Sequence, residues 1–315
     1  MTKTKILFCT DIHGSDTAYR KFLNASKMYK VNAAIVGGDI TGKALALISK
    51  TNGAYEADFL GRKWSAKNDQ ELQSIVKEFR KRGYYVHVAD PGSVAEIKAN
   101  PAKAEEFLNE YIRQSVAEWM QLAEERLKDQ GIKCYISPGN DDTYEIDPIL
   151  NSSDFVINPE DRVVMLDDQH EMITLGNVNI TPWNCPRDIP EEKLSEMIDK
   201  LTSEVKNPAM SVFNLHAPPH GTYLDLAQEL DKDLRPVMRA GQPSTVNVGS
   251  TSVRKSIEKY QPMLGLHGHI HESKAVEEIG RTICINPGSS YWDGTLNAVI
   301  VTIDKDAKSH MFITG

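Results

Sequence analysis

The sequence predicts a layered α/β protein, with helices outside sheets that are rich in valine and isoleucine. Short apolar runs alternate with amphipathic segments along the chain, and the strand, helix, strand order of residues 5–39 is typical of parallel pairing. Polar blocks of Asp, Asn and His follow several apolar runs, at the strand ends where ligands collect in such sheets. With 315 residues, of which 40% are hydrophobic and 25% charged, the chain suits one large domain or two smaller ones.

The first elements define the pattern. The run KILFCT (5–10) predicts a short buried strand, and AAIVGGD (33–39) predicts a second one that ends in a glycine turn. Between them, Tyr19, Phe22 and Leu23 lie on one face of an amphipathic helix.

Two more helices are expected before residue 132. Residues 68–83 carry apolar side chains at helical spacing and end at a glycine, and YYVHVAD (84–90) then reads as a strand. The longest helix is expected within residues 100–131, where Asn100 can cap the first turn and Pro101 can occupy its first position.

The second half contains shorter elements. Helices are expected over 191–201 and 252–260, whereas the intervening and final segments read as strands broken by turns: residues 132–142, 155–183, 210–221, 262–273, 281–290 and 295–304. Repeats and low-complexity runs are not evident, so the chain is expected to form one domain over residues 1–315.

Composition limits the classes of partner. The formal net charge of −8 and the lack of a basic, aromatic-rich stretch argue against nucleic acid or an anionic membrane as a partner. The start of the chain is not typical of a signal peptide, and no apolar run approaches the length of a membrane span. Three of the four cysteines lie in apolar runs without a C-x-x-C pair, which favours buried thiols in a reducing cytoplasm.

Five polar blocks stand directly after apolar strands: TDIHG, GGD, PGNDD, NLHAPPH and LGLHGHIHES. Their candidate ligands are carboxylates, an amide and imidazoles, without a thiolate, and they are Asp11, His13, Asp39, Asn140, His216, His269 and His271. Such donors suit Mn²⁺, Fe or Zn²⁺. Seven candidates exceed the roughly four ligands of one zinc ion, so two metals that share a carboxylate are expected, as in phosphate ester cleavage.

Each block also has a structural interpretation. Asp11 and Asp39 could be turn or N-cap residues, and residues 139–142 form a good turn sequence on backbone grounds alone. His216 alone could be an interior histidine with satisfied hydrogen bonds. The histidine triplet is harder to explain in this way, because side chains at alternate positions of a strand share one face and three unpaired imidazoles in a core would be costly.

The order of motifs, D-x-H, G-D, G-N, H and G-H-x-H, resembles that of the calcineurin-like metallophosphoesterase superfamily. GGDITGK, HAPPHGT and GLHGHIHES are also similar to a bacterial and archaeal branch of predicted phosphoesterases related to the Icc protein. The resemblance spans Asp11 to His271. It implies a four-layer fold, in which two facing mixed sheets are flanked by helices. The length of this chain adds the expectation of an insertion after the second core strand.

The resemblance also implies a ligand set. Asp11, His13, Asp39 and His271 would hold one divalent ion. Asp39, Asn140, His216 and His269 would hold the other, so that Asp39 bridges them. His267 has no counterpart in the motif and is expected to be a structural residue or one that orients a ligand imidazole.

Two departures from the family pattern need an explanation. Most of the superfamily has His after G-N, where it assists with the phosphate or the leaving group, but this chain has Asp141. A carboxylate beside two dications should stay ionised, so it would be a poor acid and would repel a phosphate. His220 is the candidate acid, although it could equally be a loop histidine without a role.

The second departure is the length of chain between Asp39 and Asn140. Residues 43–100 hold an expected hairpin, a helix and a strand, and are interpreted as an inserted, cap-like segment. A peripheral embellishment, a cap over the substrate pocket and an oligomer contact are all compatible with the sequence.

The expected function is hydrolysis of a phosphoester, either a phosphodiester or a small phosphorylated metabolite, by a hydroxide that bridges two metals. Asn140 and His216 would lie near the phosphate, and Asp141 would turn away from the substrate or orient a water. A catalytically weak metal-binding scaffold or sensor of the same fold is the alternative, with Asp141 as its sign. A DNA nuclease is disfavoured by the charge.

Overall fold

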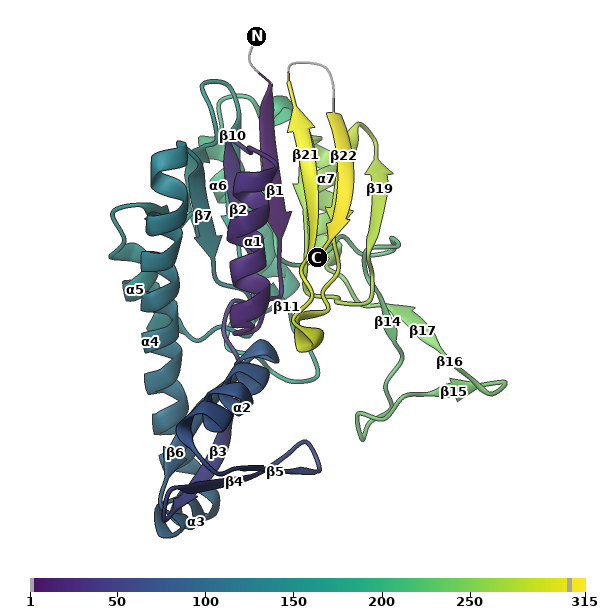
Figure 1. The fold of residues 1–315 in the computed structure, drawn as a ribbon. Helices are drawn as coiled ribbons and strands as arrows, with labels where there is room; N and C mark the ends of the chain where they lie inside the picture. Colours follow the sequence, from purple (N-terminus) through teal and green to yellow (C-terminus); the bar gives the residue numbers. More distant parts are fainter. Residues whose placement is uncertain (1–2, 305–307) are drawn as a thin grey trace.

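The computed structural model describes residues 3–304 and 308–315. Two six-stranded mixed sheets face each other and form the centre of the molecule (Figure 1). The first has the order β22-β21-β1-β2-β7-β8: β22 (Lys308–Thr314), β21 (Asn297–Ile303), β1 (Thr4–Cys9), β2 (Ala33–Gly37), β7 (Lys133–Ser137) and β8 (Val156–Ile157). The second has the order β19-β20-β18-β13-β10-β9: β19 (Ala275–Ile279), β20 (Thr282–Asn286), β18 (Leu264–Leu266), β13 (Val212–Leu215), β10 (Glu171–Leu175) and β9 (Val163–Met165).

Helices cover the outer face of each sheet. Against the first sheet lie α1 (Asp16–Met28), α4 (Pro101–Leu127) and the short α5 (Asp147–Asn151). The second sheet is covered by α6 (Glu191–Glu204) and α7 (Thr251–Tyr260). The four-layer fold expected from the motifs is therefore confirmed.

Burial on both faces explains the continuous apolar strands. In β1, Ile6 and Phe8 point into the core between the sheets, whereas Leu7 and Cys9 point towards α1 and α4. The same alternation holds along β2. The expected buried thiols are confirmed at Cys9, Cys134 and Cys284.

The segment after Asp39 forms a second, smaller α/β unit. Its four-stranded sheet has the order β5-β4-β3-β6, with β3 (Ala44–Thr51), β4 (Ala54–Phe59), β5 (Arg62–Ala66) and β6 (Tyr84–Ala89), and it is accompanied by α2 (Asp69–Lys81) and α3 (Pro91–Ala99). It has its own core, in which Ile48, Phe59 and Phe79 are buried. Figure 1 shows this insertion beside the lower half of α4, at the end of the molecule towards which β1 and β7 point.

The remaining elements are short. They are β11 (Val178–Asn179), β12 (Asp188–Ile189), β14 (Leu226–Gln228), β15 (Met238–Arg239), β16 (Gln242–Pro243), β17 (Thr245–Asn247), and the 3₁₀ turns η1 (Lys128–Gln130), η2 (Tyr144–Ile146), η3 (Pro208–Met210) and η4 (Tyr291–Asp293). The strands β14 to β17 form an arm that extends from the body (Figure 1). Within residues 3–304 and 308–315, none of the helices has the length and apolarity that a membrane crossing requires.

Candidate metal centre

Five strands deliver the candidate ligands to one place. β1, β2 and β7 are parallel neighbours in the first sheet, and β13 and β18 are parallel neighbours in the second. Asp11, Asp39, Asn140, His216 and His269 follow the carboxyl ends of these strands in that order. A hydrogen bond of 2.8 Å from His216 Nδ1 to the carbonyl of Gly37 joins the two sheets at this edge.

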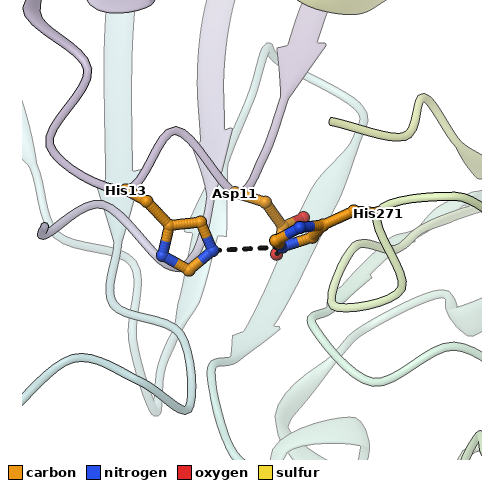
Figure 2. A group of neighbouring side chains, drawn as sticks. All are labelled: Asp11, His13 and His271. Atoms are coloured by element: carbon orange, nitrogen blue, oxygen red, sulfur yellow. Dashed lines mark hydrogen bonds and ion pairs between the residues drawn. The ribbon is translucent and has the colours of Figure 1, made fainter. Parts of the chain in front are cut away.

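The first group of candidate ligands consists of Asp11, His13 and His271, as Figure 2 shows. The Nε2 atoms of the two histidines are 3.1 Å apart, and Nε2 of His271 is 3.4 Å from Oδ1 of Asp11. Two imidazole nitrogens that face each other and a carboxylate at this distance have the arrangement of ligands around a cation.

The second group consists of Asp39, His216 and His269. Because Nδ1 of His216 is bonded to the carbonyl of Gly37, this ring presents Nε2 to the site. Within the described chain, Nε2 of His216 has no hydrogen-bond partner, although carboxylate oxygens of Asp39 and Asp11 lie 3.5 and 3.7 Å away. A buried nitrogen without a partner fits a metal ligand.

Asn140 is oriented by a neighbouring carboxylate. Its Nδ2 donates to Oδ1 of Asp188 at 3.0 Å. Oδ1 of Asn140 is buried and, among the residues that the structure describes, meets no donor. The bond to Asp188 therefore fixes which end of the amide is free, and that end is the oxygen, the atom that coordinates metals.

Asp39 presents a different oxygen to each group. Its Oδ2 is 3.6 Å from Nε2 of His13, and its Oδ1 is 3.5 Å from Nε2 of His216. Asp39 and His13 also form a third candidate group together with Asp141.

The backbone is strained at these residues. Asp11, His13, Asp39 and His269 have positive φ angles of 54°, 37°, 50° and 68°. Non-glycine residues rarely adopt this region, and such strain is concentrated at functional sites. The N-cap interpretation of Asp11 and Asp39 is wrong, because the side chain of Ser15 caps α1 and Asp39 is followed by a turn that leads into β3.

Two motif glycines are explained by close packing at the site. Gly38 has a φ of +116°, and a Cβ at this position would lie 2.5 Å from Nδ1 of His216. A Cβ at Gly139 would lie 2.2 Å from Oδ1 of Asp39. A larger residue at either position would displace a candidate ligand.

Burial and mutual proximity shift the pKa values of these groups. Burial raises the pKa of Asp39 to about 6 against the lowering effect of His216. Although burial lowers the pKa of His216, its two neighbouring carboxylates, Asp39 and Asp11, raise it to about 10. Burial lowers the pKa of His269 to about 4. The negative charge of the two buried carboxylates, Asp11 and Asp39, is one that a divalent cation would compensate.

His267 serves the structure. Its Nδ1 lies 2.8 Å from the carbonyl of Leu215 and 3.1 Å from that of Ala217, and burial lowers its pKa to about 4. The expectation that the triplet shares the face of a strand is wrong, since β18 ends at Leu266 and the histidines occupy the following turn. That turn sends His269 and His271 to different ligand groups.

Asp141 and His220 have different surroundings. Although burial raises the pKa of Asp141, Lys43 and the thiol of Cys185 lower it to about 2, so the carboxylate stays ionised. Its amide donates to Oδ1 of Asp39 at 3.0 Å. His220 is 44% exposed, with Nδ1 3.6 Å from Oδ2 of Asp225, and it belongs to none of the three ligand groups found among the described residues.

The sequence interpretation missed three neighbours of the site. Asp188 orients Asn140, Lys43 pairs with Asp141, and the ring of Tyr291 lies 4.6 Å from that of His13. Lys43 stands in the motif GGDITGK, only four positions after Asp39, and could have been found there. Asp188 and Tyr291 carry no local signal, because segments distant in the sequence bring them to the site.

Comparisons with known proteins support the fold and identify a relative. No family model matches the chain. "Uncharacterized protein MJ1162" of Methanocaldococcus jannaschii is 36% identical over 169 residues, which are 52% of this chain and 69% of that protein.

Two solved structures have the same overall arrangement. One is TT1561 of Thermus thermophilus, with a TM-score of 0.55, 13% identity, and coverage of 96% of this chain and 99% of that one. The other has a TM-score of 0.55 at 14% identity and covers 98% and 99% of the two chains. At these identities the likeness concerns the fold alone.

Proposed function

Since the chain belongs to the same family as the uncharacterized protein MJ1162 and has the metallophosphoesterase fold, we propose that it is a dinuclear metal-dependent phosphoesterase. The observation that carries the proposal is the position of Asp39, whose two oxygens face two separate groups of imidazoles. A single tetrahedral ion would need only one of these groups.

In this proposal Asp11, His13, Asp39 and His271 hold one divalent ion. Asp39, Asn140, His216 and His269 hold the other. Their oxygen and imidazole donors suit Mn²⁺, Fe or Zn²⁺. Two ions held there would supply a hydroxide nucleophile near neutral pH and would neutralise charge on the phosphoryl oxygens.

The protein's own residues hold and orient the reacting groups. Asp188 keeps the amide oxygen of Asn140 directed into the site, and the carbonyl of Gly37 keeps Nε2 of His216 directed there. Hydroxide, formed from a water that releases its proton to solvent, attacks phosphorus as the bond to the leaving oxygen breaks, and that oxygen takes up a proton. His220 remains the candidate donor of this proton. Its side chain is exposed and lies in the loop that begins at His216.

The proposed substrate is a phosphodiester or a small phosphorylated metabolite, in keeping with the likeness of the motifs to the Icc-related branch. We also propose that the insertion at residues 43–100 is a cap that shapes the substrate pocket, because Lys43 at its start contacts Asp141. The buried cysteines at positions 9, 134 and 284 fit the reducing, cytoplasmic location that we propose.

The test is hydrolysis of bis(p-nitrophenyl) phosphate and p-nitrophenyl phosphate by the full chain with added Mn²⁺. We expect turnover of at least one ester, and we expect chelation and the His216→Ala substitution each to abolish it. A protein that binds two ions per chain but cleaves neither these esters nor a panel of phosphorylated metabolites would instead be a metal-binding scaffold or sensor.

A further inference from the structure

Lys43 connects the insertion to the candidate metal centre. It lies between the turn that carries Asp39 and the first residue of β3, and its ammonium forms an ion pair with Oδ2 of Asp141. The thiol of Cys185 donates to the other oxygen of Asp141 at 2.9 Å, and the amide of Asp141 donates to Asp39. Asp141 therefore makes three contacts, with Lys43, Cys185 and Asp39. Through Asp141, Lys43 is connected to the centre of the site.

The pairing removes an electrostatic conflict. An ionised Asp141 beside a phosphate would repel it, but the ammonium of Lys43 offsets this negative charge, so the pair is neutral overall. An ammonium has three N–H donors, and one of them suffices for Asp141. The Lys43 side chain is 54% exposed, so it remains accessible to a ligand that enters from solvent.

Lys43 also lines a groove between the insertion and α4. The groove has a volume of about 350 Å³, and apolar side chains of β3, α3 and α4 form much of its wall, among them Leu45, Leu47, Ile97 and Leu108. Leu45 and Leu47 are available because β3 alternates: Ala46 and Ile48 point into the core of the insertion, which leaves the intervening residues on the other face. Lys43 is thus shared by the two places, since it pairs with Asp141 and also lines the groove.

We propose that Lys43 binds the phosphate of the substrate, that Asp141 positions its ammonium, and that the adjoining groove receives the apolar part of the leaving group. This inference rests on the proposed function and names a residue and a substrate class for the same site. The class is a phosphoester whose leaving group has an apolar body, since such a group would cover Leu45 and Leu47 while its phosphate contacts Lys43 and the metal centre.

The competing explanation is that the ion pair only fastens the insertion to the core. In that case the charge of Lys43 would affect stability and not phosphate binding. The two explanations differ in a quantity that does not depend on turnover, namely the affinity of the metal-loaded protein for inorganic phosphate.

The experiment compares Lys43→Met, Lys43→Gln and Lys43→Arg in the full, Mn²⁺-loaded chain. Calorimetry gives the Kd for inorganic phosphate, and kinetics with bis(p-nitrophenyl) phosphate gives KM and kcat separately. The matched control is Lys128→Met, because Lys128 is 61% exposed and also paired, with Glu124, but lies at the end of α4. Metal content and Tm are measured for every variant.

We expect Lys43→Met and Lys43→Gln to weaken phosphate binding and raise KM by about 10-fold to 100-fold, the cost of losing a charged hydrogen bond. Lys43→Arg should recover part of this loss, and Lys128→Met should have no effect. Phosphate affinity and KM that stay unchanged in both neutral variants would overturn the role of Lys43. A wild-type protein that cleaves no ester would refute the proposed function, while its phosphate affinity would still decide the role of Lys43.

Discussion

Nε2 of His13 and Nε2 of His271 lie 3.1 Å apart, although the two residues are 258 positions apart in the chain. Both are within reach of the carboxylate of Asp11, and this convergence is visible in Figure 2. Two facing imidazole nitrogens can be satisfied by one shared proton or by one metal ion. The carboxylate of Asp11 provides a third donor beside the two nitrogens, which suits a metal ion.

Asp39→Ala should lower turnover by more than about 100-fold. Loss of a residue that only orients a ligand lowers activity by at most about this factor. The reason is that both ligand groups lose the oxygen that faces them. Turnover and metal content are measured together, with Asp154→Ala, at an exposed position, as the control. Full turnover with two ions per chain in Asp39→Ala would contradict the bridging role.

Metal loading should stabilise the fold. An ion that binds only the folded chain adds about 2.7 kcal/mol to the free energy of unfolding when its concentration is 100 times its Kd. We therefore expect Tm to rise with added Mn²⁺ and to fall on chelation. The same titration of Asp39→Ala should give a smaller rise in Tm, and an equal rise would place the bound ion elsewhere.

Asp188→Asn should weaken metal binding by about 10-fold to 100-fold without removing any ligand. Asp188 orients Asn140 through Oδ1 and accepts backbone amides of Thr181 and Cys185 through Oδ2. Both oxygens of Asp188 accept from N–H groups, so the NH₂ group of an asparagine at this position would face one of these donors. Isothermal titration with Mn²⁺ measures the change, and a Tm close to that of wild type would separate it from a general loss of structure.

Glu160 makes the stability of the fold depend on pH. Burial raises the pKa of this carboxyl from 4.5 to about 8, against the hydrogen bond from the amide of Gly176. Between these two pH values the folded chain holds a proton that the unfolded chain has lost. Stability should therefore fall as pH rises from about 4.5 to 8.

Glu160→Gln should remove this dependence. At pH 8 the variant should be more stable than wild type by roughly 2 kcal/mol, less than the full shift implies because the side chain is partly accessible to water. Below pH 4.5 the two proteins should be equally stable in chemical unfolding. A variant that is less stable than wild type at both pH values would show that the carboxyl is needed for its hydrogen bond alone.

The sequence was sufficient to predict the layered fold and the strand ends that carry the polar residues. Strands that are buried on both faces, such as residues 5–10, are recognisable as continuous apolar runs. A polar block directly after such a run falls at the edge of the sheet. The structure brings six of the seven candidate ligands into two groups of carboxylates and imidazoles. The seventh, Asn140, has a buried side-chain oxygen that accepts no hydrogen bond from the described residues.

The neighbours of these ligands could not be predicted in the same way. Asp188 reaches Asn140 across 48 positions, and Cys185 reaches Asp141 across 44, through a connection without regular periodicity. Likewise, His269 and His271 join different groups from a turn in which His269 has a positive φ, whereas the alternation of a strand predicts that they share one face. Contacts of this kind depend on the packing of loops, which leaves no pattern in the sequence.

The most direct test of the central claim is anomalous diffraction from crystals of the protein soaked with Mn²⁺. The account predicts two peaks roughly 3.5–4 Å apart, the spacing of paired catalytic metals. One should adjoin Asp11, His13 and His271, the other His216, His269 and Asn140, and Asp39 should contact both. A single peak, or two peaks of which only one touches Asp39, would contradict the dinuclear site.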